Sequence, residues 1–384
     1  MNVQLKELRY AVTLAHAASR LAAPSVVRAI GLAVRDGALE LTAGGGGPFL
    51  RQVLQPEAPS LLPAEPVVLP AEVLHAAVTG LRGEEVRVSL DGGLRLEVDG
   101  YKVNVIPLEE APENPESPLA GGARLRLPAK AFYEALRYVA QALPKGDEQP
   151  RFEKVLLEVE PGGALHLYAT DGFWLTTAEV HGAGEGLPEA PAQLGLHRSY
   201  VGLLHFLSRA GLEEEATLSF DFSARRLGVT DGEGRELVLP GSEADFPDFS
   251  KFLAGGQPTR IVVDAEALAT AVRRMRSLIS KKDPIHLYFV AEAQRLLLRA
   301  RGDYGSAEAN LEVRGAGPSF RLAFAPRYLL PSLTGLGQAT LAVGGQRDPL
   351  LVEGEQTRAV VMPLLVDSTG VWSDFDEPAA GRAA

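Results

Sequence analysis

The sequence predicts an α+β fold, and it predicts that fold three times along a chain of 384 residues. Two short patterns recur at domain-length intervals, each where an extended apolar run gives way to an amphipathic segment. One pattern begins, at intervals of 127 and 128 residues, at Leu69, Leu196 and Phe324. The other begins, at intervals of 124 and 136 residues, at Val3, Leu127 and Val263. Because such a unit is far longer than a solenoid repeat, we expect three copies of one domain.

An amphipathic helix is expected at the start of each copy, because apolar residues recur there at helical spacing. In the third copy Asp264 stands at the N-cap position, and the apolar stripe that follows is Leu268, Val272, Met275 and Ile279. The stripe of the second copy is Phe132, Leu136, Val139 and Leu143. The weaker stripe of the first copy is Leu8, Val12 and Ala15.

Short alternating runs follow each helix, such as 155–159 and 164–168, and predict β-strands. Tight hairpin turns are expected at Asp36-Gly37, Asp91–Gly93 and Pro161–Gly163. Strands joined in hairpins, with a helix for every few of them, imply antiparallel sheets with helices on one face. The helix–strands unit occurs twice in each copy, which predicts two helices per domain.

Composition sets the domain boundaries and limits the classes of function. Junctions rich in Gly and Pro divide the chain into domains 1–120, 121–252 and 253–366, followed by an acidic tail, 367–384, that we expect to be disordered. The absence of cysteine excludes disulfides. No apolar run is long enough for a transmembrane helix. Residues 11–18 weakly resemble a secretory leader, but the charged residues around them favour a first amphipathic helix.

The net charge of −11 opposes unguided binding to nucleic acid, yet basic residues gather on the polar faces of the expected helices. One interpretation is a set of solvated helix faces. The other is that equivalent helices turn the same way in all three domains and form one surface that contacts phosphates without reading bases. The residues concerned are Lys6, Arg20, Lys130, Arg137, Arg198, Arg209, Arg273, Arg274 and Lys281.

Catalytic motifs are missing: the sequence has no P-loop, HExxH or nucleophile elbow, and its seven histidines lack metal-ligand spacing. We therefore predict no catalytic residues, no metal and no cofactor. The glycine run 44–47 is expected to form a turn, and the segment 182–186 a loop. His166 and Asp171 would be the acid–base pair of a hydrolase, but an ordinary strand position is the preferred interpretation of His166.

Three segments, in order, carry a family resemblance. The run 168–175 (YATDGFWL) resembles the ATDGHRL signature in the middle domain of the bacterial beta sliding clamp, the beta subunit of DNA polymerase III. The run 246–249 (FPDF) resembles that family's FPDY. The segments 302–305, 328–330 and 359–366 resemble its third domain, including the VVMPxxL ending. The resemblance covers about residues 1–366 and is weakest in the first domain.

This resemblance implies three clamp domains per chain, with two chains joined head to tail into a closed ring around duplex DNA. It implies a non-catalytic processivity subunit that acts in the cytoplasm at the nucleoid. The implied partners are the catalytic subunit of DNA polymerase III, a clamp loader, repair polymerases and other proteins that carry hydrophobic clamp-binding peptides. The alternative is a clamp-fold interaction scaffold that does not encircle DNA.

In this family partner peptides enter a pocket between the second and third domains. Carried over by position, the pocket residues here are Phe152, Thr170, Gly172, Leu175, Pro247, Lys251, Phe252, Tyr328, Val360, Met362, Pro363 and Leu364. The chain departs from the family pattern at Phe173-Trp174, where the signature has His-Arg, and at Leu365, where a basic residue is usual. We therefore expect a more apolar and aromatic pocket.

The resemblance also suggests which residues join the ring. The family's subunit contact pairs an edge strand of domain one with an edge strand of domain three, and the candidates here are Val103, Val105, Leu278 and Ile279. Ile279 also fits the helix stripe, so an internal position is the alternative. The tail has no counterpart in the family, and a disordered solubility tail is its preferred interpretation. In the tail, residues 371–375 (VWSDF) combine aromatic and acidic residues, which suggests that this segment visits a partner pocket.

Overall fold

The computed structural model describes residues 1–24, 26–57, 65–109, 119, 122–146, 149–208, 214–231, 234–280, 283–303, 305–345 and 347–365. The chain divides into two compact units. Unit 1 comprises Met1–Glu134, Lys154–His166 and Val180–Ala244, and unit 2 comprises Ala135–Glu153, Leu167–Glu179 and Asp245–Ala384. The three domain boundaries stay a prediction. The tail 367–384, Arg209 and Lys281 lie outside the described residues.

Unit 1 is built on antiparallel sheets. One four-stranded sheet has the order β1-β6-β7-β8, a nine-stranded sheet has the order β13-β9-β15-β16-β17-β4-β3-β2-β5, and β14 pairs with β10. These strands are β1 Asn2–Gln4, β2 Ala29–Arg35, β3 Ala38–Ala43, β4 Phe49–Leu54, β5 Val67–Pro70, β6 Glu85–Leu90, β7 Leu94–Val98, β8 Tyr101–Val105, β9 Ala123–Pro128, β10 Lys154–Val159, β13 Ala183–Glu185, β14 Ala192–His197, β15 Glu215–Asp221, β16 Arg226–Asp231 and β17 Glu236–Pro240.

Unit 2 repeats the same plan. Its larger sheet runs in the order β11-β12-β26-β25-β24-β18-β22, and a four-stranded sheet runs in the order β21-β20-β19-β23. The strands are β11 Ala164–Thr170, β12 Trp174–His181, β18 Thr259–Asp264, β19 Ile285–Val290, β20 Arg295–Gly302, β21 Gly305–Glu312, β22 Arg314–Ala316, β23 Phe320–Phe324, β24 Gln338–Val343, β25 Leu350–Glu353 and β26 Thr357–Val361.

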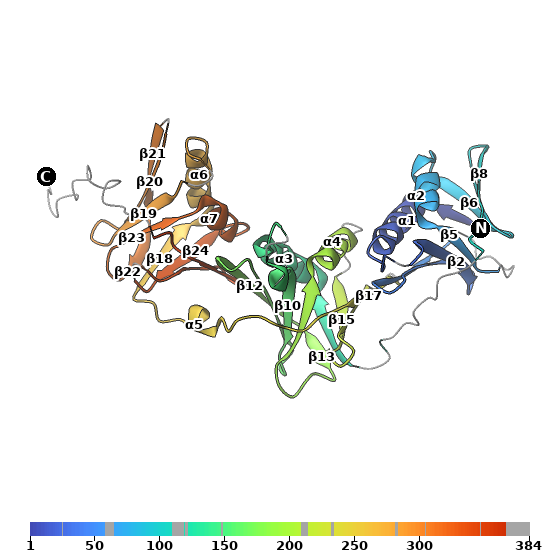
Figure 1. Ribbon diagram of the computed structural model, residues 1–384, viewed down its shortest axis with the longest axis horizontal. Helices are drawn as coiled ribbons and strands as arrows, with labels where there is room; N and C mark the ends of the chain where they lie inside the picture. The colour runs from blue at the N-terminus through green and yellow to red at the C-terminus, as the bar shows by residue number, and fades with distance from the viewer. Residues whose placement is uncertain are drawn as a thin grey trace. The chain divides into compact units, whose positions relative to one another are not determined.

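The helices follow the predicted pairs, which Figure 1 labels beside their sheets. They are α1 Leu5–Ser19 with α2 Ala71–Gly80, α3 Ala129–Val139 with α4 Arg198–Leu207, and α6 Ala265–Arg276 with α7 Pro326–Ser332. A short helix, α5 Ser250–Leu253, and two 3₁₀ turns, η1 Ala140–Ala142 and η2 Pro150–Phe152, complete the described elements. The α+β class with antiparallel sheets is confirmed. None of the helices in these ranges has the length and hydropathy needed to span a bilayer.

The first helix, α1, buries the apolar stripe that the sequence predicted. Leu8, Val12 and Ala15 are buried together with Leu5 and Ala11, and this face packs against α2 and the strands β3 and β4. Each fully buried leucine contributes about 1.5–3 kcal/mol to folding. The predicted N-cap of the third copy is also confirmed, because the Asp264 carboxylate accepts a hydrogen bond from the Ala267 N–H at 2.8 Å.

The hairpin turns follow the predicted chemistry. Asp36 and Gly37, between β2 and β3, both have positive φ angles, 51° and 81°, as a type I′ turn requires. Asp99 and Gly100 repeat this geometry between β7 and β8, at a turn that the sequence analysis did not single out. The glycine run 44–47 forms the predicted turn between β3 and β4.

Three local predictions are wrong. The segment 182–186 contains strand β13, which pairs with β9, instead of a loop. A Cβ atom at Gly182 would lie 2.3 Å from the Arg126 carbonyl oxygen, so glycine is what allows this close pairing. The stripes ending at Leu143 and Ile279 are too long, because α3 ends at Val139 and α6 at Arg276.

Candidate functional site

Unit 2 contains a cavity of about 420 Å³ that gathers residues from four separate segments of the chain. They are η2, the turn between β11 and β12, the segment that leads into α5, and the end of β26. The lining residues are Gln149, Arg151, Phe152, Thr170, Gly172, Phe173, Trp174, Leu175, Pro247, Phe249, Phe252, Val360 and Met362.

The turn between β11 and β12 is held by its own polar side chains. The Thr170 hydroxyl donates to the Trp174 carbonyl at 2.6 Å. The Asp171 carboxylate accepts from the backbone N–H groups of Phe173 and Trp174, at 2.9 and 3.2 Å. Gly172 has a φ of +88°, a conformation that strains any residue with a side chain. The turn therefore presents Phe173 outward, with 54% of the residue exposed, and Trp174 inward, with 4% exposed.

Both aromatic rings of this turn contact Tyr328 on α7. The centroids of Phe173 and Tyr328 lie 6.2 Å apart with the rings nearly parallel, and the Trp174 ring lies 6.1 Å from Tyr328 at a steeper angle. Burial raises the pKa of the Tyr328 phenol, and the nearby Asp171 carboxylate raises it further. Tyr328 therefore stays neutral at neutral pH and supports the two aromatic rings of the turn from outside the cavity lining.

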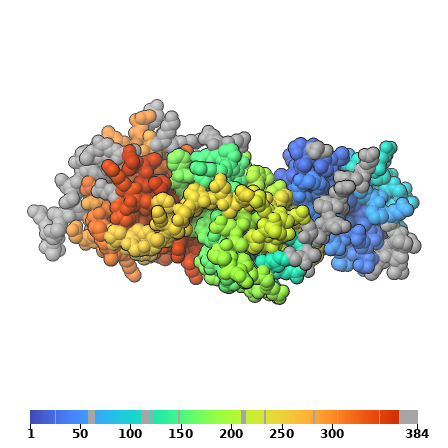
Figure 2. Space-filling view, turned by 60° about the horizontal axis from the view of Figure 1, so that its bottom comes forward, coloured from blue at the N-terminus to red at the C-terminus, as the bar shows by residue number. Residues whose placement is uncertain are grey.

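The floor of the cavity is an apolar cluster on paired strands. Leu175 on β12 lies opposite Val360 on β26, and both pack with Ala342 and Leu351. Phe249 and Leu253 cover this cluster from the α5 segment. Figure 2 shows the yellow α5 segment against the red strands of unit 2. The FPDF motif is thus anchored to the strands that form the floor.

The rim combines exposed apolar side chains with cations. Phe252 and Met362 are exposed, and the Arg151 guanidinium lies over the Phe152 ring, 4.4 Å from its centroid. Arg327 lies over the Tyr328 ring at 4.7 Å. The arrangement suits an apolar or aromatic side chain inside the cavity with a negative charge beside it.

Eight of the twelve positions predicted for the pocket line this cavity: Phe152, Thr170, Gly172, Leu175, Pro247, Phe252, Val360 and Met362. Four do not line it: Lys251, Tyr328, Pro363 and Leu364. Tyr328 contributes indirectly, through its contacts with Phe173 and Trp174.

The prediction missed five lining residues. Phe173, Trp174 and Phe249 stand inside the two motifs that carried the resemblance, so the motifs themselves contained the signal. Gln149 and Arg151 belong to no motif, and only their position beside Phe152 could have indicated them.

The basic residues singled out by charge are accessible on their helices. Lys6, Arg20, Lys130, Arg137, Arg273 and Arg274 are exposed, and Arg198 is half-buried. Arg273 is engaged at the surface, where its two terminal nitrogens donate to the Glu266 carboxylate at 3.0 and 3.1 Å. Because both partners are exposed, this pair contributes little to folding.

The predicted interface residues lie near two sheet edges. Within the described sheets β8 is an edge strand of unit 1, and β21 is an edge strand of unit 2. Leu278 is 47% exposed, and Ile279 is half-buried against Gly302 at the end of β20.

On β8, Val103 is half-buried, but Val105 is only 4% exposed within its own chain. The Val105 side chain is therefore largely covered within its own chain, and the four interface positions stay a prediction. Exposed apolar side chains are instead Tyr101 and Ile106, at the two ends of the strand.

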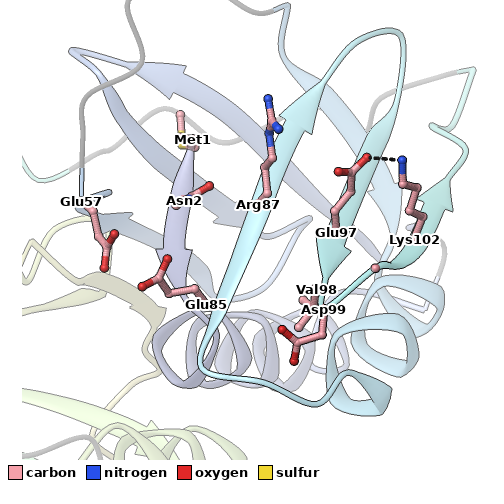
Figure 3. A pocket seen from close by; sticks show the side chains of 10 residues that line it. Met1, Asn2, Glu57, Glu85, Arg87, Glu97, Val98, Asp99 and Lys102 are labelled. Atoms are coloured by element: carbon pink, nitrogen blue, oxygen red, sulfur yellow. Dashed lines mark ion pairs between the residues drawn. The ribbon is translucent and has the colours of Figure 1, made fainter.

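A second cavity, of about 680 Å³, lies on the small sheet of unit 1 and is charged (Figure 3). Glu57, Glu85, Glu97 and Asp99 line it together with Arg87 and Lys102, and Lys102 pairs with Glu97 at 3.3 Å. A hydrogen bond from Glu57 and repulsion from its charge raise the pKa of Glu85. None of the residues predicted to be functional lines this cavity.

His166 and Asp171 both have local structural roles. His166 occupies strand β11 and lies 3.2 Å from Glu160, which confirms an ordinary strand position. The Asp171 carboxylate accepts hydrogen bonds from the backbone N–H groups of the β11–β12 turn. Across the described ranges, no group of three or more His, Cys, Asp and Glu side chains is arranged to hold a metal ion.

Comparison of the fold with solved structures gives matches over nearly the whole chain. The DNA polymerase III beta subunit of Thermotoga maritima superposes with a TM-score of 0.79 at 21% identity, covering 96% of this chain and 99% of that one. The sliding clamp of Bacillus subtilis gives a TM-score of 0.81 at 15% identity, covering 95% and 99%. This chain has the beta sliding clamp fold.

Sequence comparison gives the same family name. The beta sliding clamp of Streptomyces coelicolor is 24% identical over 295 residues, or 75% of this chain and 76% of that protein. The beta sliding clamp of Micrococcus luteus is 25% identical over 248 residues, or 64% and 77%. No protein-family model matches the chain. The resemblance stated from the motifs is thus confirmed.

A further structural match was solved with a bound peptide. The beta clamp of Helicobacter pylori was solved bound to a DNA ligase peptide, and it matches this chain with a TM-score of 0.78 at 16% identity, covering 95% of this chain and all of that one.

Proposed function

We propose that this chain is the protomer of a DNA sliding clamp, a non-catalytic subunit that encircles duplex DNA and tethers the replicative polymerase for processive synthesis. The observation that carries the proposal is the cavity of unit 2, whose lining includes residues of the family motifs 168–175, 246–249 and 359–366. Clamp relatives share the fold over nearly the full length of the chain.

The proposed ring contains two chains, each with three domains, joined head to tail. The edge strands β8 and β21 offer unpaired backbone groups, and Tyr101, Ile106 and Leu278 are exposed apolar side chains near these two edges. An exposed edge strand readily pairs with another chain. A heterologous contact that closes after two chains leaves no free end.

Duplex DNA is proposed to pass through the ring and to meet the exposed basic residues of the helices. Phosphate contacts of this kind are weak and independent of sequence, with dissociation constants on the order of 10⁻⁴ to 10⁻⁶ M. Weak contacts permit sliding, and encirclement prevents escape. The net charge of −11 is compatible with this mechanism, because only the surface that faces DNA has to be positive.

Partners are proposed to bind through the cavity. An apolar floor, an aromatic wall and a cationic rim favour a short peptide that carries hydrophobic and acidic residues. The Helicobacter pylori clamp was solved bound to a DNA ligase peptide, which supports the binding of a partner peptide. The proposed partners are the DNA polymerase III catalytic subunit, repair polymerases and the clamp loader, in the cytoplasm at the nucleoid, and we propose no cofactor for the clamp itself.

Retention on circular and linear DNA tests the proposal. The chain is loaded onto nicked circular DNA by its loader and ATP, and the DNA is then cut at one site in half of the sample. A clamp stays on circles and slides off the linear ends. Equal retention on both forms would instead support the alternative, an interaction scaffold that does not encircle DNA.

A further inference from the structure

The described part of the chain ends beside the cavity of unit 2. Strand β26 ends at Val361, and the next residue, Met362, lines the cavity and donates its backbone N–H to the Phe173 carbonyl at 3.1 Å. The Leu364 N–H donates to the Ala323 carbonyl at 2.8 Å and fixes the exit of the chain. The end segment, residues 366–384, therefore starts next to the site at which partners are proposed to bind.

The end segment has the composition that this cavity favours. Two aromatic residues, Trp372 and Phe375, stand among carboxylates, and the only basic residue of the segment is Arg382. The acidic residues are Asp367, Asp374, Asp376 and Glu377. The chain has two tryptophans, and the other one, Trp174, lies in the wall of the cavity.

The rim of the cavity supplies the opposite charge. Arg151 lines the cavity and lies over the Phe152 ring, whereas Arg327, over the Tyr328 ring, and Lys251, exposed beside Phe252, do not line it. Two carboxylates of the segments that form the cavity accept hydrogen bonds within turns: Asp171 accepts from backbone N–H groups of its own turn, and Asp248 accepts from the Ser250 N–H at 2.9 Å. Arg151 is thus the lining cation that an incoming acidic segment would meet.

The end segment is long enough to return to the cavity. Trp372 follows Met362 by ten residues, and ten extended residues span about 33–36 Å. A short tether of this kind holds a segment at an effective concentration in the millimolar range. Even a weak affinity for the cavity would then keep it occupied.

We propose that the segment Val371–Phe375 docks in the cavity of its own chain and competes there with partner peptides. Trp372 or Phe375 would enter the aromatic cavity, and the flanking carboxylates would meet Arg151. The inference rests on the proposed function for the identity of the competitors. The segment would then act as an intramolecular competitor, and a partner peptide would need a higher affinity to bind in the cavity.

Fluorescence anisotropy tests the proposal with a labelled synthetic peptide of residues 366–384 as the probe. We expect the probe to bind a chain that ends at Leu365 and to bind the full-length chain several-fold more weakly, since the tethered segment competes at an effective concentration in the millimolar range. The full-length double variant Trp372→Ala/Phe375→Ala should regain the affinity of the shortened chain. The matched control Ser368→Ala, which lies outside the segment Val371–Phe375 and leaves both aromatic residues in place, should behave as the unaltered chain does.

A second measurement uses the intact protein. With 5-fluorotryptophan in place of tryptophan, the ¹⁹F signal of Trp372, assigned with Trp372→Phe, should move toward its free position when Phe173 is changed to Ala. Equal binding of the probe to the full-length and shortened chains, or no binding to the shortened chain, would overturn the proposal. If the Trp372 signal shifts on dilution, the segment docks in the cavity of a second copy of the chain, and this result would also overturn the proposal. Retention of the shortened chain on circular DNA keeps such a failure distinct from failure of the clamp function.

Discussion

The ring of Phe173 stacks against the ring of Tyr328, with 6.2 Å between the centroids and 17° between the planes. One residue belongs to the turn before β12 and the other to α7, so the contact links two segments that are distant in the sequence. The stack explains how a largely exposed phenylalanine stands where the family signature has a histidine. It also turns that position into part of an apolar wall.

Replacing Phe173 by alanine should weaken the binding of a partner peptide without unfolding the chain. An aromatic pair contributes about 0.5–1.5 kcal/mol beyond its buried area, so we expect a loss of affinity of about 2- to 13-fold. The shortened chain ending at Leu365 and a labelled peptide from the cognate polymerase serve for the titration. Tyr101→Ala removes an equally exposed aromatic residue from unit 1 and should leave the affinity unchanged. The same loss in both variants would contradict the role of the aromatic wall.

A charge at either proposed interface edge should dissociate the ring. Ile106 is 81% exposed at the end of β8, and arginine there would have to be desolvated between the two chains. We expect Ile106→Arg and Leu278→Arg to weaken dimerisation by at least about tenfold, measured by sedimentation equilibrium. Val73→Arg, at an exposed apolar position of α2, is the control and should stay dimeric. Dimers of unchanged affinity in both edge variants would exclude these edges as the interface.

Features that depend on neighbouring residues were predictable from the sequence. The stripe Leu8, Val12 and Ala15, the N-cap Asp264 and the turn Asp36-Gly37 each follow from spacing or local hydrogen bonding. Features that depend on packing between distant segments were not. The family resemblance singled out both Val103 and Val105, but the sequence did not show that Val105 is buried while Val103 is half-buried.

The cavity was predictable only in part, for the same reason. Its lining comes from four segments, and no periodicity brings them together. The family motifs indicated most of it, because the turn at Thr170 and the FPDF run each form as local units. Arg151 has no such motif, and its place over Phe152 depends on how η2 packs onto unit 2.

Acidity should affect the small sheet of unit 1 through Glu85. The neighbouring Glu57 raises the pKa of Glu85 above its ordinary value of 4.5, so the folded chain binds this proton more tightly than the unfolded chain does. The resulting contribution to stability is present below pH 4.5 and is lost as the pH rises through the folded pKa. We expect Glu85→Gln to raise Tm slightly at pH 7 and to have no effect at pH 3.5, in thermal melts followed by circular dichroism. A Tm increase of equal size at both pH values would show that the effect is not the shared proton.

The basic helix residues should determine how DNA binding depends on salt. Each phosphate contact releases counterions, so the slope of log K against log salt concentration is about −0.9 per contact. Replacing Lys6, Arg20, Lys130 and Arg137 together by alanine should therefore make the slope less negative by up to about 3.6 for each chain of the ring, measured by fluorescence anisotropy on a short duplex. Arg273→Ala should change it less, because its guanidinium already pairs with Glu266. The control is Arg95→Ala, an exposed arginine on β7 that donates to Asn104. If the control alters the slope as much as the helix variants do, binding depends on total charge and not on a helix surface that faces DNA.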